Sequence, residues 1–120
     1  MRSDRRTVLA TLLLALAAGC AAPPTAIQQR RQIVDYYSRG SYGRCVRESD
    51  QWLLRHEVAY PKLAPGIRFF KALAYRDQGE TEKARMLFRD IVQRYADVPE
   101  GHPAVKWRRW AEQELSLLAP

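Results

Sequence analysis

An internal repeat with a period of 39 residues constrains the fold of this chain more than any other feature of its sequence. A shift by 39 positions superposes Tyr36 on Tyr75, Gly40 on Gly79, Cys45 on Ala84, Trp52 on Ile91 and His56 on Tyr95. A period of roughly 20 to 50 residues is typical of solenoids, in which each unit buries its apolar face against its neighbours. Since the whole chain has 120 residues, two such units leave room for one small domain only.

The second unit shows a helical period. Its apolar residues recur three and four positions apart, as on one face of an α-helix: Ala84, Leu87, Phe88, Ile91, Val92 and Tyr95. Glu80 and Glu82 stand at the start of this pattern, where acidic side chains suit the positive end of a helix dipole. The helix is therefore expected to begin between Gly79 and Thr81. A preceding helix, which carries Phe69, Phe70, Ala72, Leu73, Ala74 and Tyr75, is expected to end at Gly79.

The same period predicts the rest of the domain. The first hairpin should span roughly Ile27 to Arg39 and Tyr42 to His56, and the segment Glu57 to Pro65 should join it to the second, with a break at Ala64-Pro65-Gly66. A last helix is expected with Pro103 at its first position. Its apolar side, which would cap the second hairpin, carries Trp107, Ala111, Leu115 and Leu118.

These residues resemble the tetratricopeptide repeat, a helix-turn-helix unit of about 34 residues. That family has a small residue, a tyrosine, a turn residue, a second small residue and a large apolar residue at fixed positions. The second unit matches them, in this order, with Ala72, Tyr75, Gly79, Ala84 and Phe88. The first unit keeps Tyr36, Gly40 and a small Cys45, but has Ile33 and Ser49 at the other two positions. The resemblance implies an all-α fold over residues 26–120, a short α-α hairpin solenoid of about two repeats plus a C-terminal capping helix.

The N-terminus has the pattern of an export signal. Basic residues are followed by a mostly apolar run from Val8 to Ala18 and by Gly19-Cys20. As a helix, these 11 residues would span about 16 Å, well short of the roughly 30 Å of a bilayer core. The segment ending at Cys20 resembles a bacterial lipoprotein signal, although Ala17 stands where that family usually has Leu. The resemblance implies removal of residues 1–19, a lipid on Cys20 and a short tether over residues 20–25.

Two alternatives concern this signal. An ordinary secretory signal, cleaved for instance after Ala22, would discard Cys20. The pair Arg5-Arg6 fits a twin-arginine signal, but it also fits any basic N-terminus.

In the lipoprotein family an Asp after the Cys favours retention in the inner membrane, and here the residue is Ala21. The resemblance therefore implies the periplasmic face of the outer membrane, and the chain looks like the small repeat lipoproteins of Gram-negative envelopes.

Nothing in the sequence points to catalysis. A lipid on Cys20 would leave Cys45 without a disulfide partner, and we expect Cys45 to be a buried structural thiol. His56 and His102 are isolated, and Glu112 and Glu114 would point in different directions on a helix. HExxH, CxxC, Gly-rich phosphate-loop and GxSxG motifs are absent from the sequence. We therefore expect a protein that is not an enzyme and takes no metal or cofactor.

The segment Trp107-Arg108-Arg109-Trp110, with Lys106 beside it, combines cations with aromatic rings and could bind nucleic acid. An exported lipoprotein rarely meets nucleic acid, however, and helical spacing places Trp107 on the packing side with both arginines on a solvated side. We expect no nucleic-acid partner. Anionic lipid headgroups, lipopolysaccharide phosphates or an acidic protein would suit the arginines better.

The first helix of each tetratricopeptide hairpin lines a concave surface that holds a peptide. The resemblance implies such a surface here at Arg30, Val34, Tyr37, Phe69, Leu73 and Arg76. The expected function is a scaffold that binds another envelope protein, with the membrane reached through the lipid anchor. Phe69 and Leu73 could instead be core residues. As an alternative function, the basic surface of this chain, with a net charge of +7, could bind peptidoglycan or lipopolysaccharide.

Overall fold

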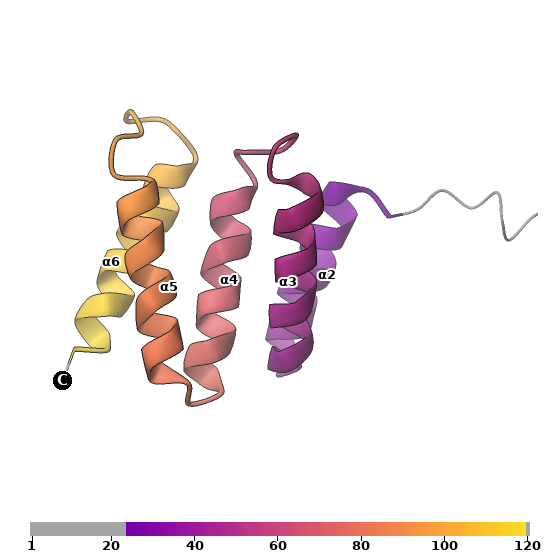
Figure 1. Cartoon of the computed structure of the whole chain (residues 1–120), viewed down its shortest axis with the longest axis horizontal. Helices are drawn as coiled ribbons and strands as arrows, with labels where there is room; N and C mark the ends of the chain where they lie inside the picture. Colours follow the sequence, from indigo (N-terminus) through magenta and orange to yellow (C-terminus); the bar gives the residue numbers. More distant parts are fainter. Residues whose placement is uncertain (1–23, 120) are drawn as a thin grey trace, which may run out of the picture.

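The computed structural model describes residues 24–119, and the predicted signal peptide (residues 1–19), Cys20 and the first part of the tether lie outside this range. The described chain is entirely α-helical, with no strand, as predicted. Its five helices are α2 (Ala26–Ser38), α3 (Tyr42–His56), α4 (Ala64–Asp77), α5 (Thr81–Arg94) and α6 (Ala104–Leu117) (Figure 1). Within these residues no helix is long and apolar enough to cross a membrane.

The helices form two antiparallel hairpins, α2-α3 and α4-α5, and α6 packs against the second hairpin (Figure 1). The central helix is α4, which contacts each of the other four. Because α4 touches both α2 and α6, the helix α6 takes the place that the first helix of a third hairpin would occupy. The structure is therefore consistent with a short hairpin solenoid that ends in a capping helix, as the repeat predicted.

Both hairpins turn in the same way at the glycines that the repeat superposes. Gly40 and Gly79 have positive φ angles of 79° and 82°, a conformation that costs glycine little. The backbone N–H after each glycine reaches back over the helix end, from Ser41 to the Tyr36 carbonyl and from Glu80 to the Tyr75 carbonyl, at 2.9 Å in both cases. This is the Schellman ending of a helix, repeated 39 residues apart.

Side-chain packing follows the same period. Arg44 lies over the ring of Tyr36 at 4.4 Å, and 39 positions later Lys83 lies over the ring of Tyr75 at 5.5 Å. Cys45, like Ala84, is fully buried, as expected for a structural thiol.

The two hairpins distribute core volume differently. The first hairpin has a small Ser49 followed by a large Trp52, whereas the second has a large Phe88 followed by a smaller Ile91. All four side chains are buried. Trp52 also donates a 2.9 Å hydrogen bond from its indole nitrogen to the Ala26 carbonyl, which links α3 to the start of α2. The larger side chain of each pair thus stands three residues later in the first hairpin than in the second.

Two helix starts differ from the prediction. The helix α4 begins at Ala64, so that Pro65 and Gly66 lie inside its first turn instead of breaking the chain. Proline is tolerated there because the first N–H groups of a helix have no partner within the helix. Conversely, α6 begins at Ala104, and Pro103 is its N-cap residue, one place earlier than its predicted position inside the helix.

The start of α2 is fixed by a capping box. The Thr25 side chain accepts a 3.1 Å hydrogen bond from the backbone N–H of Gln28, and the Gln28 side chain accepts one of 2.9 Å from the backbone of Thr25. The predicted tether therefore leads directly into a well-capped helix.

Candidate functional site

The candidate site is the surface formed by α2, α4 and α6, which we call the first-helix face. It carries the six predicted binding residues, three on α2 and three on α4. Arg30, Val34 and Tyr37 are half-buried on α2. On α4, Arg76 contacts Tyr37 of α2 and Glu114 of α6, and Phe69 packs against Trp107 of α6. The six residues have different surroundings.

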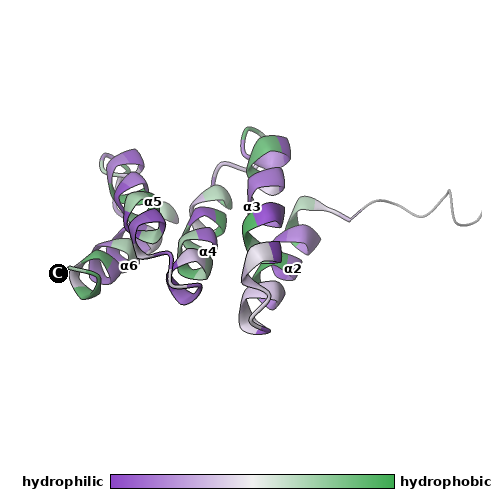
Figure 2. Ribbon diagram, turned by 60° about the horizontal axis from the view of Figure 1, so that its bottom comes forward, coloured by the Kyte–Doolittle hydropathy of each residue, from purple (hydrophilic) through white to green (hydrophobic). Residues whose placement is uncertain are grey.

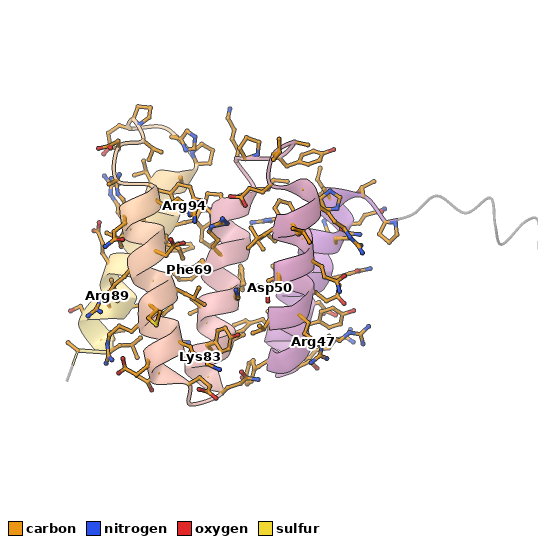
Figure 3. The ribbon with its side chains drawn as sticks, in the orientation of Figure 1. Arg47, Asp50, Phe69, Lys83, Arg89 and Arg94 are labelled. Atoms are coloured by element: carbon orange, nitrogen blue, oxygen red, sulfur yellow. The ribbon has the colours of Figure 1, made fainter. Side chains whose placement is uncertain are left out.

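Phe69 and Leu73 belong to the core. They are only 6% and 9% exposed and lie in the cluster that packs α4 against α5 and α6. The Phe69 ring is 5.6 Å from the ring of Phe88 and 5.4 Å from that of Trp107, and Figure 3 shows it between α4 and α5. These two side chains therefore contribute packing and offer a partner little surface, as the core interpretation of them proposed.

One end of the first-helix face is closed by a network of polar side chains, the Tyr37–Glu114 network. The hydroxyl of Tyr37 donates a 2.6 Å hydrogen bond to Asp77. The Arg76 guanidinium donates to Asp77 at 2.9 Å, to Glu114 at 2.6 Å and to the Tyr37 hydroxyl at 3.3 Å. Two internal carboxylates thus already hold Arg76, so a partner's carboxylate would have to compete with them.

The electrostatics of this network follow from burial and from the ion pairs. Burial and the hydrogen bond to Asp77 raise the pKa of Tyr37 to about 12. Burial alone would raise the pKa of Asp77, but its hydrogen bonds with Arg76 and Tyr37 outweigh this effect and lower it. Burial would likewise lower the pKa of Arg76, whereas its bonds to Asp77 and Glu114 raise it. All three groups therefore keep one protonation state around neutral pH.

The other end of the first-helix face has a pocket of about 480 Å³, which we call the basic pocket. It lies between α2, the connection from α3 to α4, the connection from α5 to α6, and the first turns of α6. Its charged and titratable lining residues are Arg30, Lys62, Glu100, His102, Lys106 and Arg109. Its one carboxylate, Glu100, is engaged in a 2.9 Å ion pair with Arg109. Cations therefore outnumber anions in the pocket.

Arg30 and Trp107 line the basic pocket where α2 and α6 approach the start of α4. The approach depends on Gly66, because a Cβ atom there would lie 3.0 Å from the Trp107 ring and 3.2 Å from a terminal nitrogen of Arg30. The Nε of Arg30 is buried and has no hydrogen-bond partner among residues 24–119. The Lys106 ammonium lies 4.8 Å from the ring of Trp107 and 5.3 Å from that of Trp110. The pocket thus combines cations with aromatic rings.

Only Arg30 among the pocket's charged residues belongs to the predicted set. Lys62 lies in an irregular connection, where no periodicity indicates a direction for its side chain. Lys106 and Arg109 stand beside the tryptophans, and that combination of cations and rings was the available sequence signal. His102, predicted near a helix cap, accepts a 3.0 Å hydrogen bond from the Ala104 N–H at the start of α6.

One expectation about α6 is wrong. Arg108 was expected on a solvated side, but its side chain is only 17% exposed. Its guanidinium donates to the carbonyls of Tyr95 and Ala96 at 2.9 and 3.1 Å, at the C-terminal end of α5. Helix ends leave carbonyls without partners, and Arg108 satisfies two of them. Arg109 is exposed, as expected, and Trp107 is buried on the packing side.

Cys45, Glu112 and Glu114, which the sequence raised and set aside as catalytic candidates, take part in packing and pairing. Burial raises the pKa of the Cys45 thiol to about 11, so this residue is a thiol and not a thiolate at neutral pH. Glu114 pairs with Arg76, while Glu112 lies 3.9 Å from Arg108. Among residues 24–119, no three His, Cys, Asp or Glu side chains gather as metal ligands would.

Comparison with known proteins gives no relative: the chain matches no family model, no curated protein and no solved structure. The class of this protein is therefore given by its fold alone: an all-α assembly of two hairpins and an end helix, with a basic pocket on its first-helix face.

Proposed function

We propose that this protein is a lipid-anchored, non-enzymatic adapter of the bacterial cell envelope that holds an acidic segment of another protein on its first-helix face. The observation that carries the proposal is the basic pocket, in which four Lys or Arg side chains face one carboxylate that is already paired. The proposed location at the outer membrane rests on the sequence pattern that ends at Cys20.

The pocket suits an acidic peptide for two reasons. Its volume of about 480 Å³ accommodates a few side chains, a size common among binding sites in proteins. Its cations could pair with carboxylates while Trp110, which is 42% exposed, covers apolar parts of the same segment. The net charge, which is +7 for the full chain and +5 without residues 1–19, would also favour encounter with acidic partners.

Photocrosslinking in living cells tests this proposal. A photoreactive amino acid is placed at Val34 or at Lys106, both on the first-helix face. The matched control is Arg89, an exposed residue of α5, which is not one of the three helices of the first-helix face (Figure 3). We expect one crosslinked protein from both test positions and none of it from Arg89. Charge reversal by Arg30→Glu should abolish the crosslink at Lys106, and equal crosslinking with and without this change would refute the proposal.

An anionic glycan is the second candidate partner. The observation that favours it is the stacking of Lys106 on Trp107 and Trp110, because an exposed indole beside a cation suits a charged sugar. Because both candidates would bind through exposed charges, both should weaken as the ionic strength rises, and the purified partner distinguishes them: only a glycan partner makes the protein sediment with peptidoglycan or with lipopolysaccharide at low salt. Co-sedimentation with purified peptidoglycan or with lipopolysaccharide, at low and at high salt, measures the difference.

A further inference from the structure

Four large apolar side chains are exposed at the end of the domain where the described chain begins. They are Ile27 (53% exposed), Leu54 (88%), Val58 (97%) and Tyr60 (43%), and we call them the anchor-side patch. They come from the start of α2, the end of α3 and the connection between α3 and α4. In Figure 1 these three segments lie together at the upper end of the molecule, on the side where the chain enters α2.

The patch is carried by ordered backbone. The connection after α3 is closed by hydrogen bonds from the Tyr60 N–H to the His56 carbonyl at 2.8 Å and from the Leu63 N–H to the Tyr60 carbonyl at 3.1 Å. The His56 ring lies 6.2 Å from the Tyr60 ring, and its Nε2 is 2.7 Å from the side-chain oxygen of Gln29 on α2. The start of α2 and the connection therefore form one structural unit. Val58, in particular, is displayed to solvent by a structured turn.

Exposed apolar side chains that gather at one end of a small protein indicate a contact surface. Basic side chains accompany these. Arg55 follows Leu54 directly, and Arg31 lies one helical turn beyond Ile27; both are exposed. Figure 2 shows the same mixture of apolar and polar segments at the ends of α2 and α3. Apolar groups with neighbouring cations match the interface of a membrane that contains anionic lipids.

The length of the tether points to the same partner. Six residue steps separate Cys20 from Ala26, and at no more than about 3.5 Å per residue they reach about 21 Å. The helices have 13 to 15 residues and are therefore about 20 to 22 Å long, so the far end of the domain lies one further helix length away. A lipid on Cys20 would thus hold the anchor-side patch, and not the far end, within easiest reach of the bilayer.

We propose that the anchor-side patch rests on the bilayer that holds the lipid anchor. Its apolar side chains enter the headgroup region, and Arg31 and Arg55 lie against lipid phosphates. This inference rests on the lipid anchor of the proposed function. Because the helices start and end at the patch, they stand upright on the membrane. The basic pocket, whose Lys62 belongs to the same connection as Val58 and Tyr60, then opens beside the membrane surface, and the Tyr37–Glu114 network lies at the far end.

Fluorescence quenching in vesicles tests the orientation. The full chain, exported with its own N-terminus, carries an environment-sensitive fluorophore at Val58→Cys or, as the matched control, at Leu117→Cys. Leu117 is an equally apolar, 78% exposed residue near the end of α6, at the opposite end of the molecule. The buried Cys45 does not compete for the label. The vesicles contain phosphatidylethanolamine, a minority of phosphatidylglycerol, and lipids with a quencher near the headgroup.

We expect the Val58 probe to shift to the blue and to be quenched several-fold more strongly than the Leu117 probe. The double change Leu54→Ser and Arg55→Ser should reduce the quenching at Val58 while the circular dichroism spectrum stays the same. Mass spectrometry of the same sample reports the lipid on Cys20. A lipidated chain with equal quenching at both positions would overturn the orientation and leave the anchor intact, whereas a chain without lipid would overturn both. If the quenching at Val58 becomes weaker as the protein concentration rises, a second copy of the chain covers the patch, and this result also refutes the proposal.

Discussion

The hydroxyl of Tyr37 on α2 donates a 2.6 Å hydrogen bond to the carboxylate of Asp77 on α4, 40 positions later in the chain. Arg76 extends this contact to Glu114 on α6 at 2.6 Å. The first helices of the two hairpins and the end helix are thereby joined by polar side chains at one end, while Gly66 and Trp107 bring α4 and α6 together at the other. Each of these contacts joins residues of different helices, and the Tyr37–Asp77 and Gly66–Trp107 contacts lead to measurable predictions.

Removal of the Tyr37 hydroxyl should destabilise the domain modestly. We expect Tyr37→Phe to lower the free energy of unfolding by about 1 kcal/mol, the usual net value of one hydrogen bond in a partly exposed site. Asp77→Asn should cost more, because it also weakens the pair with Arg76. Denaturant titration of both variants and of the double variant measures the coupling. Strictly additive effects would show that the two side chains do not interact in solution.

A methyl group at Gly66 should destabilise the domain, whereas one at Gly43 should not. Alanine is favoured over glycine in a helix by up to about 1 kcal/mol. At Gly66 the new Cβ would lie 3.0 Å from the Trp107 ring, which is held by the core, so we expect a net loss of about 1 to 3 kcal/mol. At Gly43 in α3 the nearest atom is a flexible arginine end at 3.5 Å. Thermal unfolding of Gly66→Ala and Gly43→Ala should therefore shift in opposite directions, and a stabilised Gly66→Ala would contradict the packing described.

The first hairpin has its large core side chain at Trp52 and a small one at Ser49, the reverse of the order in the second hairpin. This difference predicts that a substitution at Trp52 can restore stability lost by a substitution at Ser49. Ser49→Phe introduces the residue that the second hairpin has at Phe88, but Trp52 already fills the space, so the single change should cost about 1 to 3 kcal/mol. Adding Trp52→Ile restores the arrangement of the second hairpin and should recover part of this loss. The free energies of unfolding of both single variants and the double variant decide the matter. A double variant that is less stable than the sum of the single effects would rule out the compensation.

Alkaline pH should destabilise the domain through Cys45 and Tyr37. Burial raises the pKa of Cys45 from 9.0 to about 11, so the folded state binds this proton more tightly than the unfolded state does. The corresponding stability is complete below pH 9.0 and is lost as the pH rises to about 11. The stability that depends on the Tyr37 proton is lost in the same way as the pH rises from 10.0 to about 12. Cys45→Ala, the residue found at Ala84 in the second unit, should remove the first part of this dependence.

Unfolding titrations from pH 7 to pH 11 check the alkaline prediction. In the wild type, a thiol reagent should react with Cys45 only as fast as the chain opens, because the side chain is fully buried. Rapid labelling of the folded protein at pH 8, or an unchanged pH profile in Cys45→Ala, would show that the thiol is accessible.

Much of the fold could be predicted from local sequence features. The spacing of Leu87, Phe88 and Ile91 requires a helix, and the turn glycines Gly40 and Gly79 require helix endings that only glycine adopts easily. Both are properties of a few neighbouring residues, so they can be read without knowledge of distant contacts. Local features do not determine the helix boundaries at Pro65 and Pro103, because proline is compatible with the first turn of a helix as well as with the turn before it.

The candidate site could be predicted only in part. The resemblance to the tetratricopeptide repeat assigned Phe69, Leu73 and Arg76 to a binding surface on α4, but it could not show that α6 covers the first two, or that Glu114 meets the third. The same limit explains Arg108, whose direction depends on where α5 ends.

The sequence alone therefore determined the helices, their pairing and the repeat, since these follow from residues close together in the chain. The tertiary structure alone decided which side chains meet. Arg30, Lys62 and Lys106 come from three segments that are far apart in sequence, and they line one pocket only because α2 and α6 pack against the same central helix. Contacts between distant segments depend on the packing of the whole domain, which no local pattern records.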